Sequence, residues 1–107
     1  MRLVTDTGIH SLGFSQGEAK SYVNQAMGEV CCGSDTEVDR YIAEPAQATA
    51  YLVGMLEILE LRARAEEALG EDFDLAAFHD VVLGHGAVPL EVLGHLVDEW
   101  IEAVRAA

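Results

Sequence analysis

The feature that most constrains the fold of this chain is a series of helix-start signals. Residues 15–18 and 34–37 each read Ser-x-x-Glu, a capping box in which the serine hydroxyl and the glutamate satisfy free backbone N–H groups of a first helical turn. Asp74 and Pro89 are typical of two further helix starts. No segment shows a convincing two-residue alternation of a strand. We therefore expect an all-α fold of four or five helices in a single domain over residues 1–107.

Stop signals set the expected lengths of these helices. Gly28 breaks the first, and the second must stop before Pro45, because a residue that precedes proline avoids the helical region. The longest helix is expected over residues 45–69, with Gly70 as its stop. Since residues 46–56 are apolar almost all round, we expect this helix to be central and its first half buried.

Two more helices are expected in the C-terminal third of the chain. One runs over residues 75–83 after its Asp74 cap, and the other begins at Pro89. The last helix carries one apolar stripe, formed by Leu90, Leu93, Val97, Trp100, Ile101 and Val104.

Charge excludes one large class of partner. Nineteen acidic and six basic residues give a net charge of −13, so binding to nucleic-acid phosphates is not expected. The acidic surface either aids solubility or attracts a basic partner or cationic ligand. No apolar stretch reaches the roughly 20 residues of a membrane span, and residues 1–6 show no apolar core of a secretion signal. These observations predict a cytoplasmic protein without membrane contact.

Neither the cysteines nor the histidines predict a metal site. Cys31 and Cys32 are adjacent, a spacing that rarely forms a disulfide, so we expect free thiols in a loop, with an intersubunit disulfide or a reactive surface pair as the alternative. His79 and His85 are six residues apart and would lie on different helix faces. His95 could hold an adventitious metal at most. We therefore expect no metal and no cofactor.

Two segments resemble a known family. They are residues 6–15 (DTGIHSLGFS) and residues 37–41 (EVDRY) followed by Pro45, Gln47, Ala48, Tyr51 and Gly54. Together they resemble the C-terminal part of the bacterial "domain of unknown function 885" family, distant relatives of the gluzincin zinc metallopeptidases. In that family the zinc is held by an HExxH-like helix and a later Glu, both upstream of the matched region. The resemblance thus implies a substrate-side half-site without the metal, and a helix over residues 3–10.

The resemblance also implies roles for individual side chains. His10 is the expected catalytic residue, an acid/base or transition-state-stabilising group, with Asp6 four residues earlier to orient it. Tyr41 and Tyr51 are expected to donate to a developing oxyanion. The alternative for His10 is that it caps or packs against a neighbouring helix.

Arg40 and Gln47 complete the expected half-site as substrate-binding residues, and a guanidinium favours an anionic or carbonyl-bearing ligand. The alternative is that Arg40 pairs with Asp39 or Glu44 while both tyrosines pack in the core. Two positions depart from the family pattern, and the second of them removes a cation expected in the cleft. Ala46 replaces an expected glycine, and Leu52 replaces a lysine that usually follows the tyrosine.

Three functions are compatible with these residues. The chain is a metallopeptidase-like module that needs a metal-bearing partner chain, a free-standing small-molecule-binding protein or enzyme that uses His10 as an acid/base, or a helical interaction protein without chemistry. Loss of the metal-bearing part would expose apolar faces, so we also expect a homodimer. The candidate surfaces are residues 46–56 and the Trp100–Ile101 stripe.

Overall fold

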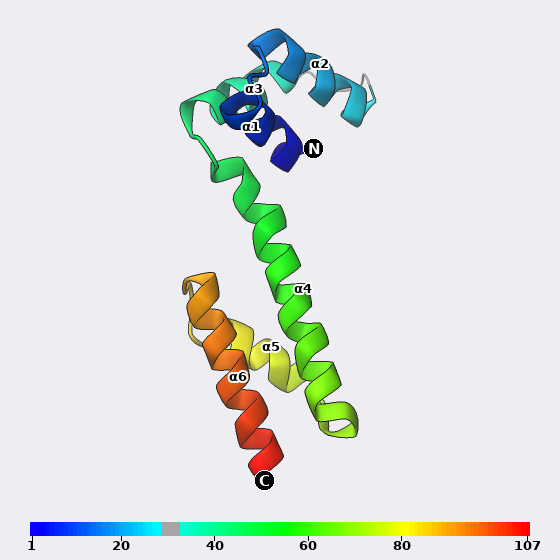
Figure 1. The fold of residues 1–107 in the computed structure, drawn as a ribbon, viewed down its shortest axis with the longest axis vertical. Helices are drawn as coiled ribbons and strands as arrows, with labels where there is room; N and C mark the ends of the chain where they lie inside the picture. The colour runs from blue at the N-terminus through cyan, green and yellow to red at the C-terminus, as the bar shows by residue number, and fades with distance from the viewer. Residues whose placement is uncertain (29–32) are drawn as a thin grey trace. The chain divides into compact units, whose positions relative to one another are not determined.

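The computed structural model describes residues 1–28 and 33–107, and within them every regular element is a helix (Figure 1). The described elements are α1 (Arg2–Ser11), α2 (Gln16–Met27), α3 (Ser34–Ala43), η1 (Gln47–Thr49), α4 (Ala50–Leu69), η2 (Gly70–Asp72), α5 (Leu75–Gly84) and α6 (Leu90–Ala106), where η marks a 3₁₀-helix. The all-α class is confirmed. The expected count of four or five is wrong, since six α-helices lie in the described part of the chain.

The extra helix is α1, which the residues themselves signal poorly. Its N-cap, Met1, makes no side-chain hydrogen bond, and the helix contains β-branched residues and Gly8. Only the family resemblance predicted a helix here. Gly8 has a packing reason, because a Cβ at this position would lie 2.4 Å from the ring of Phe14.

The contacts group into two compact units, Met1–Val53 and Gly54–Ala107. In the first unit α1 packs against α2, α3 and η1. Its apolar core consists of Ala19, Val23 and Val38, with Ile9 packed against them. The predicted capping box of Ser15 and Glu18 is confirmed, and Gly28 ends α2 in the left-handed conformation.

The second unit is held by α4, α5 and α6. Leu61, Ala65 and Leu69 of α4 pack with Phe78 of α5, and the stripe of α6 supplies Leu93, Val97 and Ile101. Trp100 stands edge-on to Phe73, with ring centroids 6.2 Å apart. The Asp74 cap is confirmed, since its carboxylate accepts from the N–H groups of Ala76 and Ala77.

Two expectations about the middle of the chain are wrong. The second capping box does not form, because Gly33 is the N-cap of α3 and makes no side-chain bond. The long helix begins at Ala50 rather than Pro45, after a turn in which Ala46 takes a left-handed φ of 68°. Residues 46–56 are not buried as a block, as Met55 and Leu56 are 50% and 53% exposed. The burial expected here needs a packing partner, and a sequence pattern cannot supply one.

The Cys31–Cys32 pair lies outside the described residues, so its predicted free thiols stay a prediction. Among the helices of residues 1–28 and 33–107, none combines the length and apolar character needed to cross a membrane.

Candidate functional site

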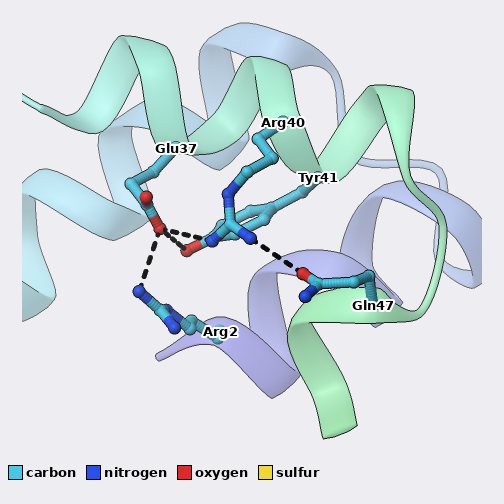
Figure 2. A network of polar contacts seen from close by, with 5 residues as sticks. All are labelled: Arg2, Glu37, Arg40, Tyr41 and Gln47. Carbon is cyan, nitrogen blue, oxygen red and sulfur yellow. Dashed lines mark hydrogen bonds and ion pairs between the residues drawn. The ribbon is translucent and has the colours of Figure 1, made fainter. Parts of the chain in front are cut away.

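A polar network in the first unit brings the start of α1 together with α3 and the turn before α4 (Figure 2). One carboxylate oxygen, Oε2 of Glu37, is its centre. It lies 3.3 Å from Nη2 of Arg2 and 3.1 Å from Nη2 of Arg40, and it accepts a 2.8 Å hydrogen bond from the Tyr41 hydroxyl. Three donors from two helices therefore converge on a single oxygen.

Arg40 also links α3 to the turn that follows it. Its Nη1 donates to Oε1 of Gln47 at 2.8 Å (Figure 2). The structure thus brings the predicted site residues Arg40 and Gln47 into direct contact. The carboxylate that pairs with Arg40 is that of Glu37, one helical turn away. It is not that of Asp39 or Glu44, which were considered as the alternative.

Aromatic rings stabilise both guanidinium groups. The Cζ atom of Arg2 lies 5.1 Å from the ring centroid of Tyr51, and that of Arg40 lies 5.5 Å from the ring centroid of Tyr41. Both distances fall within the range of a cation–π contact. Tyr51 joins the network through Arg2.

The electrostatics of the network fix its protonation state. The hydrogen bond from Tyr41 lowers the pKa of Glu37, and the two arginines lower it further. Burial raises the pKa of Tyr41, and the bond to Glu37 adds to this. At neutral pH Glu37 is therefore an anion and Tyr41 a neutral donor. Two arginines and one carboxylate leave the network with one net positive charge.

Arg2 is a member of the network that sequence reasoning missed. It lies 35 positions before Glu37, and only the tertiary fold brings them together. The sequence contains one weak signal that Arg2 lies near the site. Arg2 precedes the predicted site residue Asp6 by four residues, so the two lie on the same side of a helix.

Asp6 has a different role from the predicted one. Its side chain is buried, with 2% exposure, and Oδ1 accepts from the backbone N–H of Ala46 at 3.0 Å. Among the hydrogen bonds of the described residues, none joins Asp6 to His10. Asp6 therefore holds the left-handed turn at Ala46, which positions the neighbouring Gln47 against Arg40.

His10 lies at the other end of Tyr41 from the network. Its Nε2 is 2.8 Å from the backbone carbonyl oxygen of Tyr41, at the end of α1 opposite Arg2. Eight residues of helix separate His10 from Arg2, a rise of about 12 Å. A carbonyl only accepts, so Nε2 carries the proton, and a neutral imidazole keeps its lone pair on Nδ1. The structure thus places His10 beside the Tyr41 backbone and Tyr51 beside Arg2.

A surface pocket of about 280 Å³ adjoins the Arg2 end of the network. Its lining is mostly apolar and consists of Met1, Arg2, Leu3, Ala48, Tyr51 and Leu52. Of the six predicted site residues, this pocket includes only Tyr51.

Two guanidinium groups around one carboxylate suit an anionic ligand group. Across the described residues, no group of three or more His, Cys, Asp or Glu side chains could hold a metal ion.

Comparison with known proteins identifies a family and a similar solved structure. The family described as "Bacterial protein of unknown function (DUF885)" matches residues 1–97. The chain is also similar to a crystal structure of a candidate lipoprotein from Colwellia psychrerythraea, with 47% identity and a TM-score of 0.89. The match covers 95% of this chain and 17% of that one, so the chain spans about a sixth of the related protein. No curated protein matches the chain.

The lipoprotein comparison contradicts one expectation. Lipoproteins are anchored to a membrane by a lipid, which is inconsistent with the cytoplasmic location that we expected. That expectation rested on the composition of residues 1–6. A leader or a lipid-attachment site is a feature of a full-length protein. The match covers 17% of the related chain, so the composition of residues 1–6 does not test for either feature.

Proposed function

We propose that the first unit of this chain is the substrate-binding side of a metallopeptidase-like site. The premise is that the chain belongs to the DUF885 family of bacterial proteins. The metal would be held by residues outside this chain's described part, either in another part of a family-length protein or in a partner chain. In this proposal the chain corresponds to the C-terminal part of the family.

The observation that carries the proposal is the cationic network around Glu37. Arg2 and Arg40 are two of only six basic residues in a chain of net charge −13, and they converge on one point. Their side chains are 39% and 32% exposed, so solvent and ligands reach them. A guanidinium in this setting binds a carboxylate or a polarised carbonyl oxygen.

The other site residues have supporting roles in this proposal. Tyr41 is 1% exposed and donates a hydrogen bond to Glu37, so it fixes the carboxylate that orients both arginines. Tyr51 is 62% exposed and can contact a ligand directly. His10 is the acid/base candidate of this proposal, for a substrate that extends along Tyr41 to the free ring nitrogen, Nδ1.

A chimaera tests this function. The matching segment of the Colwellia psychrerythraea lipoprotein is replaced by this chain, and hydrolysis of a peptide mixture is followed with and without zinc. We expect zinc-dependent hydrolysis that Arg40→Ala lowers about tenfold or more. Arg62→Ala is the matched control, because Arg62 is a half-exposed arginine paired with Glu66 in the second unit. A folded, zinc-loaded chimaera that cleaves no peptide would refute the proposal.

A second candidate is a small-molecule-binding protein without hydrolysis. The 280 Å³ pocket beside Arg2 and Tyr51 favours it, since a mostly apolar lining with a few polar groups is typical of ligand sites. Ligand binding that persists when the chimaera shows no hydrolysis would select this candidate.

We also propose an extracytoplasmic location for the protein, by similarity to the lipoprotein. Fractionation of cells that express the full-length gene product would test it. Recovery of the protein with the soluble cytoplasmic fraction would contradict it.

A further inference from the structure

The donors of the two arginines are only partly used. A guanidinium has five N–H donors in a fixed fork. Arg2 contacts Glu37 through Nη2 alone, and Arg40 uses Nη2 for Glu37 and Nη1 for Gln47. The remaining N–H groups of Arg2 can therefore bind a second carboxylate without breaking the network.

The charge of the network favours such a group. Glu37 neutralises one of the two positive charges, and Gln47 and Tyr41 are neutral. Figure 2 shows both guanidinium groups directed at the Glu37 carboxylate, with a dashed line from one carboxylate oxygen to each of them. A ligand carboxylate at Arg2 would bring the cluster of two arginines and Glu37 to neutrality.

The pocket next to Arg2 determines which chemical group the ligand can carry beside its carboxylate. Leu3, Leu52 and Ala48 provide apolar walls, and the Tyr51 ring stands over the Arg2 guanidinium. The pocket opens beside the charge, so an apolar group there must be attached close to the carboxylate.

From these contacts we propose that Arg2 and the Tyr51 pocket bind a carboxylate with an apolar side group next to it, the chemistry of the C-terminal residue of a peptide. Arg2 holds the carboxylate, and the pocket receives the apolar side chain. The inference rests on the proposed function, since it names the substrate class of the same site.

Titration of the intact chain, followed by NMR, tests this without any hydrolysis. The probe is N-acetyl-L-leucine, and its matched neutral analogue is N-acetyl-L-leucinamide. We expect saturable shifts at Arg2 and Tyr51 with the acid, and binding of the amide weaker by about tenfold or more. Acetate, which has the charge but no side group, should also bind at least about tenfold more weakly.

Variants separate this site from general charge attraction. Arg2→Ala should weaken binding of the acid about tenfold or more, and Arg62→Ala should leave it unchanged. If Arg2→Ala does not fold, Arg2→Lys keeps the charge and loses the fork, and we expect about threefold weaker binding or more.

Several results would overturn the proposal. They are equal binding of the acid and the amide, equal loss in the Arg2 and Arg62 variants, or wild-type affinity in Arg2→Lys. Selective binding of the acid without hydrolysis by the chimaera would leave this inference standing while the proposed hydrolase fails. Hydrolysis by the chimaera without selective binding of the acid would support the proposed hydrolase and refute this inference.

Discussion

At the residue scale, Ala46 is where the structure stores backbone strain. Its φ of 68° lies in the left-handed region, where a Cβ crowds the following carbonyl and costs about 1–2 kcal/mol. Asp6 holds this turn through the Ala46 N–H, and the family resemblance leads one to expect glycine here. Alanine is therefore not the residue best suited to this turn.

Ala46→Gly should therefore stabilise the first unit by about 0.5–1 kcal/mol, because the relief of strain exceeds the added entropy of the unfolded chain. Hydrogen exchange of the α1 and α3 amides measures this directly. Ala50→Gly is the matched control, since Ala50 has a φ of −57° and the same change there should cost about 1 kcal/mol. A destabilised Ala46→Gly variant would show that the left-handed turn is not strained.

Glu37 makes the stability of the first unit depend on pH. The pKa of Glu37 is lowered below its ordinary value of 4.5, chiefly by the Tyr41 hydrogen bond. Its contribution is therefore complete above pH 4.5 and is lost as the pH falls through the lower, folded-state pKa. Glu37→Gln should remove this part of the acid sensitivity. The measurement is hydrogen exchange of the α3 amides of both proteins from about pH 6 to about pH 3, and parallel curves would contradict the prediction.

At the element scale, the connection between α1 and α2 depends on close packing at Gly8. Phe14 lies over the helix there, and the backbone N–H of Phe14 donates to the Gly8 carbonyl at 2.8 Å. Gly8→Ala should force the ring away and destabilise the unit by about 1–3 kcal/mol, although alanine favours an isolated helix. Gly84→Ala is the control, because a Cβ at Gly84 meets nothing within 4 Å. Hydrogen exchange of α1 for Gly8→Ala and of α5 for the control gives the two effects.

Several local signals predicted their elements correctly, although the capping box at Ser34 did not form, whereas features that depend on tertiary partners were not predictable. The Ser15 box, Gly28 and the Asp74 cap act through neighbouring residues, and all three are confirmed. The burial of residues 46–56 depends on what packs against them, and the prediction failed there. The contacts of the candidate site also divide into local ones and ones that depend on the tertiary fold. Arg40 and Gln47 meet across one short turn, whereas Arg2 reaches Glu37 only through the packing of α1 on α3.

At the scale of the whole molecule, the chain exposes apolar side chains that a relative of full length could cover. The match corresponds to 17% of the Colwellia psychrerythraea chain. Met55, Leu56 and Leu59 of α4 are each at least half exposed, at 50%, 53% and 52%. The other candidate surface is less available, because Ile101 is 6% exposed and Trp100 packs against Phe73 and Phe78.

We therefore predict that the isolated chain forms a dimer at tens of micromolar through this part of α4, since exposed apolar patches favour self-association. Leu59→Glu places a charge in the contact and should shift the sedimentation coefficient to that of a monomer of 11.5 kDa. Ala103→Glu adds the same charge at an exposed position of α6 and should leave the dimer intact. A monomeric wild-type chain at that concentration would contradict the prediction. Equal dissociation in both variants would show that charge repulsion, and not the apolar face of α4, controls assembly.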